Sequence, residues 1–163
     1  MQQKITPNLW FDNQAEEAAN FYISVFDNSR IVSIARYTEA GPGEPGTVMT
    51  IEWELDGQRF VGINGGPLFT FSEAVSFMIT CETQEEIDYY WDKLSEGGSE
   101  GPCGWLKDRY GLSWQVRPRG MSELYAGDPA AAARTAQAMF AMRKLDIAAL
   151  EAAHAGTAPV TAA

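Results

Sequence analysis

The sequence predicts an α+β fold: two βαβββ modules that form curved, mainly antiparallel sheets around a cleft, followed by C-terminal helices. The first observation is an internal repeat, because a strand and helix at residues 9–26 recur at residues 78–94, with Glu85 lying 69 positions after Glu16. The second is that each copy continues into strands that turn at a glycine. The third is a change after residue 118, where the chain becomes alanine-rich. A paired set of sheets places the expected functional site in the shared cleft.

The first module is expected at residues 4–66. Its apolar periodicity and β-branched residues predict four strands and one helix, namely strands at 5–11, 30–37, 47–55 and 58–63 and a helix at 14–26. The last two strands are joined by Asp56-Gly57, a pair that favours a two-residue hairpin turn because both positions adopt positive φ readily.

The second module is expected at residues 75–118, after a linker at 68–74. Its predicted elements are a strand at 75–81, a helix at 84–94 and short strands around 103–107 and 112–117. Thr83 and Glu86 have the spacing of a capping box, which predicts the helix start. Gly111 lies only 54 positions after Gly57, so the second copy has lost residues from its middle strands.

Residues 1–120 are therefore interpreted as one domain of two modules, and residues 121–163 as a helical extension with a tail. Asp128-Pro129 marks the start of a helix that is expected to reach about Lys144, and Asp146 is expected to cap a second helix. Two alternatives stay open for the extension. It packs on its own domain, or it crosses to a second subunit.

Composition narrows the class of partner. The chain of 163 residues is 45% hydrophobic, enough for a proper core, and acidic, with a formal net charge of −10 and a pI of about 4.5. A surface with this charge repels phosphate backbones and anionic lipids, so we expect neither nucleic acid nor membrane as a partner. The opening residues lack the pattern of a secretion signal, and the expected location is cytoplasmic.

Several motifs together resemble the vicinal oxygen chelate superfamily, the glyoxalase and bleomycin-resistance fold, and within it the PhnB-like branch. The matching stretches are Pro7-Asn8-Leu9-Trp10-Phe11, Glu16-Glu17-Ala18, Asp56-Gly57, Asn64-Gly65-Gly66-Pro67, Val75-Ser76-Phe77, Gly104-Trp105-Leu106, Asp108-Arg109-Tyr110-Gly111 and Ser113-Trp114-Gln115. The resemblance covers about residues 5–118. It implies the two-module fold named above, and homodimers are common in that superfamily.

The PhnB-like branch often carries the label 3-demethylubiquinone-9 3-methyltransferase. A typical methyltransferase holds its methyl donor with a glycine-rich turn that follows the first strand and leads into a helix. Asn64-Gly65-Gly66-Pro67 is not such a turn, because no helix is predicted directly after it. We therefore do not expect methyltransferase activity.

The resemblance also implies where a metal would bind. In that superfamily the ligands are His, Glu or sometimes Gln on the first and last strand of each module. The corresponding positions here hold Thr6 (or Asn8, with a register shift of two), Val61, Ser76 and Gln115. Hydroxyl and aliphatic side chains do not replace imidazole and carboxylate around a transition metal. The expectation is that the cleft holds no metal and no cofactor.

Strand alternation and composition select the residues expected to line the cleft. The candidates for ligand binding are Asn8, Trp10, Trp53, Ile63, Ser76, Met78, Thr80, Trp105, Ser113, Gln115 and Arg117. Apolar and aromatic side chains with few polar groups are typical of a small-molecule site. Trp105, in a stretch rich in glycine and proline, is also a candidate for a mobile lid.

Two functional classes remain open. The first is metal-free binding of a small, partly aromatic molecule, and the second is an enzyme of the superfamily with atypical or absent metal ligands. Glu52 and Glu54 decide part of this question: they alternate on one face of a strand, and that face either meets solvent or lines the cleft. Only the second register leaves room for acid-base catalysis. The expected partners are a small-molecule ligand and a second copy of the chain.

Overall fold

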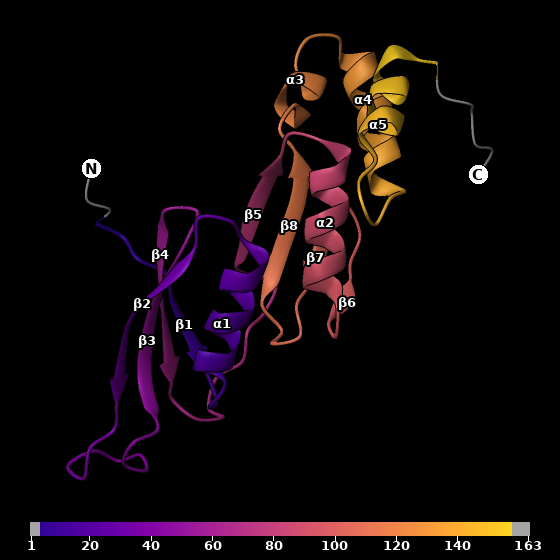
Figure 1. Ribbon diagram of the computed structural model, residues 1–163. Helices are drawn as coiled ribbons and strands as arrows, with labels where there is room; N and C mark the ends of the chain where they lie inside the picture. Colours follow the sequence, from indigo (N-terminus) through magenta and orange to yellow (C-terminus); the bar gives the residue numbers. More distant parts are fainter. Residues whose placement is uncertain (1–3, 158–163) are drawn as a thin grey trace. The chain divides into compact units, whose positions relative to one another are not determined.

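The computed structural model describes residues 4–157 (Figure 1). The chain divides into two compact units, Met1–Phe71 and Ser72–Ala163, and the division falls within the segment expected to be a linker. Of the tail expected at residues 157–163, Thr157 donates its N–H to the carbonyl of Ala152, and the rest lies outside the described residues. Each unit contains one four-stranded mixed sheet and is described by itself.

The first unit is a complete βαβββ module. Its elements are β1 (Asn8–Phe11), α1 (Ala15–Val25), β2 (Arg30–Arg36), β3 (Val48–Leu55) and β4 (Gln58–Asn64), in the sheet order β1-β4-β3-β2. β1 runs parallel to β4, and the other neighbours are antiparallel. β1 begins at Asn8, later than expected, after Pro7, which has no N–H to donate to the sheet. Asp56 and Gly57 both have positive φ (43° and 80°), as the predicted hairpin turn requires.

The core of this unit lies between α1 and one face of the sheet. Ala15, Ala18, Tyr22 and Val25 are buried at helical spacing. The sheet approaches closely at Gly62, where a Cβ would lie 3.1 Å from the Cβ of Ala15. The first turn of α1 is attached to the sheet by a side chain of β4, because Oδ1 of Asn64 accepts a hydrogen bond (2.9 Å) from the N–H of Ala15.

The second unit repeats this plan with shorter outer strands. Its elements are β5 (Ser76–Cys81), α2 (Gln84–Ser95), β6 (Ser99–Glu100), β7 (Trp105–Lys107) and β8 (Ser113–Pro118), in the order β5-β8-β7-β6. The predicted capping box is confirmed, since Oγ1 of Thr83 accepts from the N–H of Glu86. β6 has 2 residues and β7 has 3, against 7 in β2 and 8 in β3, which confirms the loss from the middle strands.

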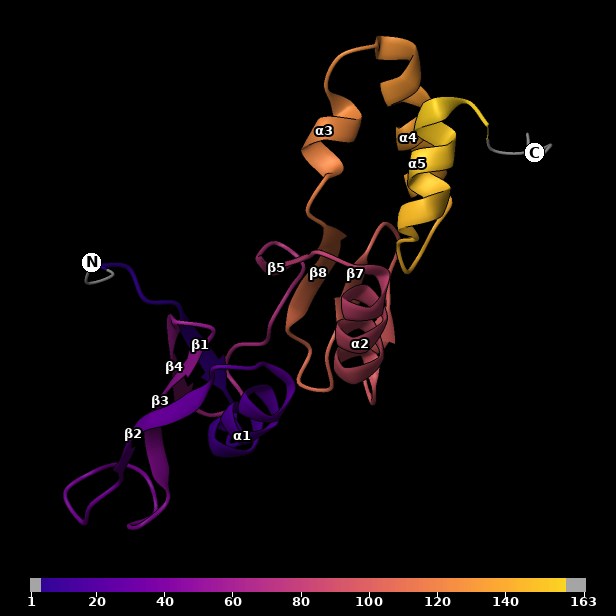
Figure 2. The same ribbon diagram turned by 45° about the horizontal axis from the view of Figure 1, so that its top comes forward.

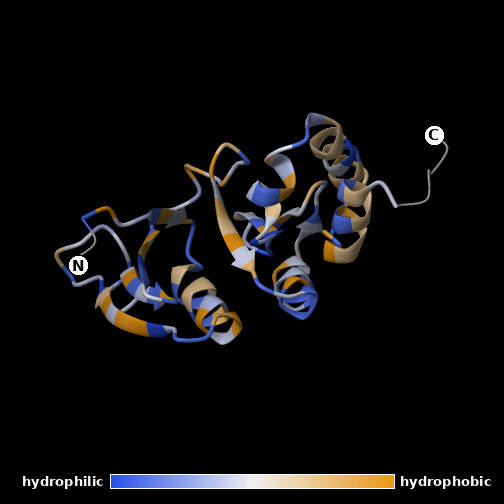
Figure 3. Cartoon of the chain, turned by 90° about the horizontal axis from the view of Figure 1, so that it is seen from above, coloured by the Kyte–Doolittle hydropathy of each residue, from blue (hydrophilic) through white to orange (hydrophobic). Residues whose placement is uncertain are grey.

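The extension continues the second unit with three helices, α3 (Met121–Tyr125), α4 (Pro129–Phe140) and α5 (Ile147–Ala155). α3 was not expected, and α4 ends at Phe140 rather than at Lys144. α4 and α5 lie side by side in both ribbon views (Figures 1 and 2). Their alanine-rich sequences appear as pale orange ribbon with blue patches in Figure 3. The extension contacts α2 of its own chain, and the alternative, that it crosses to a second subunit, stays a prediction.

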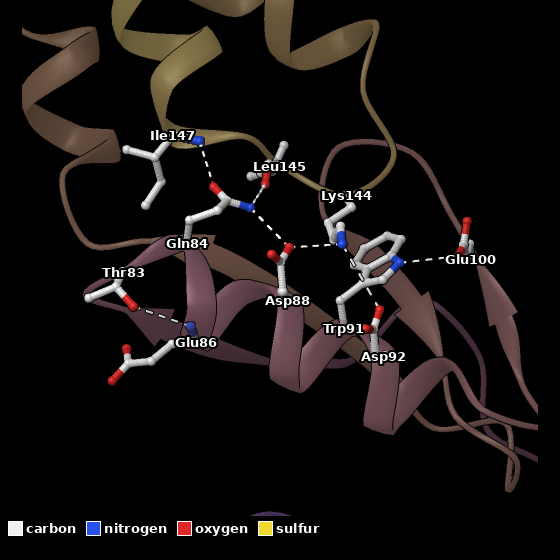
Figure 4. Close-up of polar contacts among 10 residues, drawn as sticks. All are labelled: Thr83, Gln84, Glu86, Asp88, Trp91, Asp92, Glu100, Lys144, Leu145 and Ile147. Atoms are coloured by element: carbon white, nitrogen blue, oxygen red, sulfur yellow. Dashed lines mark hydrogen bonds and ion pairs between the residues drawn. The ribbon is translucent and has the colours of Figure 1, made fainter.

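The side-chain amide of Gln84 links α2 to the extension (Figure 4). Its Nε2 donates to the carbonyl of Leu145 (3.1 Å), and its Oε1 accepts from the N–H of Ile147 (2.9 Å). Lys144 forms an ion pair with Asp88 (2.8 Å), which lowers the pKa of Asp88 and raises that of Lys144. Leu145 is fully buried in a small apolar cluster. These contacts fix the start of α5 against α2.

Gln84→Ala should loosen the extension without unfolding the module. The change leaves the N–H of Ile147 and the carbonyl of Leu145 without the amide, which costs about 1–2 kcal/mol. Hydrogen exchange at Leu145 to Ile147 should therefore become faster, while exchange in β8 should not change. Lys93→Ala, at an exposed position of the same helix, is the control. Equal exchange in both variants would contradict the assigned role of Gln84.

Candidate functional site

Each sheet has one face covered by its helix and one helix-free face, which is the face opposite α1 or α2. In the first unit, Asn8, Trp10 and Ile63 lie on the helix-free face, as expected from alternation. Nε1 of Trp10 donates to the carbonyl of Gly66 (2.9 Å), and its ring meets Phe69 edge-on at 5.0 Å. Trp10 is therefore held in place within its own unit.

Trp53 does not lie on this face, and its expected role as a lining residue is wrong. Its side chain is 0% exposed. The ring stacks on Phe60 (centroids 5.7 Å apart) and Tyr22 (6.2 Å apart), beneath α1. β3 presents its apolar residues to the helix, and Trp53 is part of the core.

Glu52 and Glu54 consequently point to the helix-free face. This is the one of the two predicted registers that leaves room for acid-base catalysis. Both carboxylates face an arginine on the neighbouring strand: Arg59 lies 3.1 Å from Glu52 and 3.5 Å from Glu54. Arg30 adds a second ion pair to Glu54 at 3.3 Å. Each carboxylate is thus engaged with at least one guanidinium group rather than directed at an empty part of the face. These residues form a cross-strand ion-pair cluster.

The second unit places its candidates on one helix-free face as well. β8 lies between β5 and β7, so that Met78, Gln115 and Trp105 are aligned across three strands. Ser76 and Ser113 are aligned in the next row, and Nε2 of Gln115 donates to Oγ of Ser76 (2.8 Å). Thr80 and Arg117 form the last aligned pair. The structure therefore brings together seven of the expected residues on one sheet.

A pocket of about 460 Å³ lies at the outer part of this face. Its lining comes from the turn before β5, from β6 and the loop after it, and from β7 and β8: Glu73, Ser99, Glu100, Gly101, Pro102, Trp105, Leu106, Lys107 and Ser113. The volume is within the range of small-molecule sites. Two of the expected residues, Trp105 and Ser113, line the pocket.

Trp105 belongs to a strand rather than to a lid. It is half-buried at the start of β7, and its carbonyl accepts from the N–H of Gly101 (2.8 Å). The turn before it is tight, with positive φ at Cys103 (58°) and Gly104 (82°). A Cβ at Gly104 would lie 2.6 Å from the carbonyl oxygen of Val116, so only glycine fits here. The backbone of Trp105 is thus part of the sheet, and the residue lines the pocket.

Ser113 is the buried polar group of the pocket. Its side chain is 0% exposed, and its Oγ has no hydrogen-bond partner among the residues that the structure describes. Lys107 is its direct neighbour across the β7–β8 pair. The ammonium of Lys107 forms an ion pair with Glu73 (2.5 Å), which lowers the pKa of Glu73.

Sequence reasoning did not select Lys107 or Glu73. Lys107 had a signal, because it follows Trp105 by two positions and therefore shares its face of the strand. Glu73 had none, because it lies in a turn whose path the residue pattern does not determine.

The donors needed for a transition metal are not assembled here. Among residues 4–157, no group of three or more His, Cys, Asp or Glu side chains lies close enough to hold an ion. Of the positions implied by resemblance, Val61 is aliphatic, and the amide of Gln115 is bonded to Ser76. The residues present do not fit a divalent metal of the kind that the superfamily uses.

Other reactive groups are committed to structure. Burial raises the pKa of Cys81 to about 12, so its thiol stays protonated and is not a nucleophile at neutral pH. The single histidine, His154, lies in α5 with Nδ1 3.3 Å from Oγ1 of Thr135 on α4.

Within residues 4–157, no helix has the length and apolar composition that a membrane span requires.

Comparison with solved structures gives the fold class. The chain is similar to a putative 3-demethylubiquinone-9 3-methyltransferase, PhnB protein, from Bacillus cereus (47% identity, 71% of this chain, 99% of that chain, TM-score 0.65). It is also similar to protein PA1353 from Pseudomonas aeruginosa (17% identity, 72% and 98% covered, TM-score 0.60). A third is the fosfomycin resistance protein FosX from Listeria monocytogenes, crystallised with Mn(II) and a sulfate ion (11% identity, 76% and 98% covered, TM-score 0.52). The fold is that of the vicinal oxygen chelate superfamily.

A family model described as 3-demethylubiquinone-9 3-methyltransferase matches residues 3–117. The chain belongs to this family, the PhnB-like branch of the superfamily. The match ends before α3, so the extension lies outside it. No curated protein is similar enough to the chain to count as a match.

Proposed function

We propose that the chain binds a small planar molecule in the pocket of the second module, without a metal ion. The observation that carries the proposal is a pocket of about 460 Å³ lined by Trp105, which belongs to a strand, and by Ser113, whose buried hydroxyl has no partner among the described residues. Apolar lining with few polar groups suits a flat, partly aromatic compound, which gains most from stacking on an indole.

The family label does not lead to methyl transfer in this chain. The glycine-rich stretch after β4 is turned inward: the N–H groups of Gly65 and Gly66 donate to the carbonyls of Phe11 and Asp12. The carbonyl of Gly66 accepts from Trp10. A loop whose two glycine N–H groups bond to its own chain does not have them available for a methyl donor.

Two flat probes of equal size test the pocket: 2-naphthoate, which is anionic, and 2-naphthamide, which is uncharged. Trp105→Ala should weaken binding of both probes by about tenfold or more, equivalent to about 1.4 kcal/mol, because the stacking surface is lost. Isothermal titration calorimetry measures the affinities. Phe140→Ala, which removes an exposed aromatic ring outside the pocket, is the matched control and should bind as the wild type does.

The result that would overturn the proposal is equal affinity in Trp105→Ala and the wild type, or no binding of either probe. A native mass spectrum of protein purified without denaturation complements the titration. A retained compound that is present in the wild type and lost in Trp105→Ala would support the assignment of the pocket.

A further inference from the structure

The charged groups of the pocket point to the chemistry of its ligand. Lys107 and Ser113 are neighbours across β7 and β8, and both line the pocket. Paired residues on adjacent antiparallel strands have Cβ atoms about 5 Å apart, so the ammonium and the hydroxyl can contact the same group of a ligand. Together they offer N–H and O–H donors and one positive charge, the combination that a carboxylate accepts.

The hydroxyl of Ser113 lacks a hydrogen-bond partner from the described residues around it. A fully buried hydroxyl normally has a hydrogen-bond partner, and Oγ of Ser113 has none among the described residues. The neighbouring hydroxyl of Ser76 receives a hydrogen bond from Gln115. A ligand oxygen would supply this partner once the side chains that cover Oγ of Ser113 move aside.

One carboxylate of the chain lies beside this place. Glu73 is in the turn immediately before β5, its side chain is 63% exposed, and its Oε1 lies 2.5 Å from Nζ of Lys107. The hydrogen bond and charge of Lys107 lower the pKa of Glu73. Because the Glu73 side is largely exposed to water and the Lys107 side chain is 36% exposed, the pair is weak and can be exchanged for another anion.

We propose that the pocket recognises the carboxylate of a planar acid, and that Glu73 holds the place of that carboxylate at Lys107 when the pocket is empty. The inference rests on the proposed function, because it assigns the ligand class of the same pocket. In the bound state the ligand carboxylate pairs with Lys107 and accepts from Oγ of Ser113, and Glu73 turns out to solvent. Glu73 thereby lowers the affinity for acids, because an acid has to displace it from Lys107. An uncharged flat compound does not have to displace it.

Glu73→Gln tests this inference separately from the proposed function. Removal of the competing carboxylate should raise the affinity for 2-naphthoate by about three- to tenfold, since the binding-competent fraction rises. The affinity for 2-naphthamide should change less than about twofold, because an uncharged probe does not compete with Glu73 for the ammonium. Glu96→Gln is the matched control: it removes one charge from an exposed ion pair with Arg109, outside the pocket.

Two further variants test the recognition directly. Lys107→Met should weaken 2-naphthoate about tenfold and reduce its preference over 2-naphthamide to near unity. Ser113→Ala should weaken 2-naphthoate more than 2-naphthamide. Circular dichroism of each variant establishes that the fold is kept.

The outcomes are distinguishable. If both probes bind through Trp105 but Glu73→Gln leaves the affinity for 2-naphthoate unchanged or lowers it, the inference is wrong and the proposed function stands. If neither probe binds to the wild type or to Glu73→Gln, both are wrong. A rise in affinity for 2-naphthoate in Glu96→Gln equal to that in Glu73→Gln would show a general effect of net charge and would also overturn the inference.

Discussion

Trp53→Ala should lower the free energy of unfolding by about 3–5 kcal/mol, the range found when a large buried aromatic side chain is removed. The indole lies between Phe60 and Tyr22 and fills the space that Gly62 leaves open, where a Cβ would be 2.9 Å from Trp53 Cζ3. No neighbouring side chain can fill this volume without moving the sheet. Guanidinium unfolding, followed by circular dichroism, measures the change.

Trp53→Phe is the informative comparison. Nε1 of Trp53 is buried and has no hydrogen-bond partner among the described residues, so phenylalanine loses volume but no hydrogen bond. We expect a cost of about 1–2 kcal/mol. Phe140→Ala, at an exposed position, should cost about 0.5 kcal/mol or less. Should Trp53→Ala prove as stable as Phe140→Ala, the placement of Trp53 in the core would be wrong.

Asp108→Ala is expected to cost about 3 kcal/mol. The carboxylate is 2% exposed and accepts three hydrogen bonds in the turn between β7 and β8: from the N–H groups of Tyr110 (2.9 Å) and Leu112 (3.1 Å) and from Nε1 of Trp114 (2.8 Å). Alanine leaves these donors without an acceptor, and buried donors that are left unpaired cost about 1–3 kcal/mol each when water cannot reach them. Because the turn aligns Lys107 with Ser113, probe binding should weaken too.

A double-mutant cycle tests which contact matters. In Asp108→Asn the amide keeps an oxygen for the two backbone N–H groups but turns a second donor toward Nε1 of Trp114. Trp114→Phe removes the opposing donor, so Asp108→Asn should cost less in that background than in the wild type. A fully additive pair would argue against the bond between Asp108 and Trp114 as a source of stability.

Much of the fold followed from the repeat. The strand and helix at residues 9–26 and their second copy fixed both module helices, and Asp56-Gly57 fixed a hairpin turn. The ends of elements were less certain because they depend on tertiary contacts. α4, for example, ends at Phe140, after which the carbonyls of Met142 and Arg143 accept from the N–H groups of Cys103 and Gly104. Those bonds join segments far apart in the sequence.

The face of β3 was harder to assign. Alternation separates Glu52 and Glu54 from Ile51 and Trp53, but it does not say which side the helix covers. Aromatic side chains that line a cleft and aromatic side chains that pack in a core produce the same alternation with polar residues along one strand. The decision comes from α1, whose Tyr22 meets Trp53. Two residues that line the pocket of the second module were among the candidates: Ser113 through strand alternation, and Trp105 through its place in a stretch rich in glycine and proline.

The two-residue length of β6 has a consequence for how the halves of this chain can diverge. In the first half the equivalent position is occupied by a seven-residue strand, whose backbone is engaged along β3. In the second half, β6 ends at Glu100, and Gly101 and Pro102 follow it as a wall of the pocket beside Trp105, with the N–H of Gly101 still donating to the carbonyl of Trp105. We expect substitutions at these two positions to change the wall of the pocket without altering the sheet of the first half. The shorter outer strand of the second half thus leaves part of the pocket wall outside the sheet.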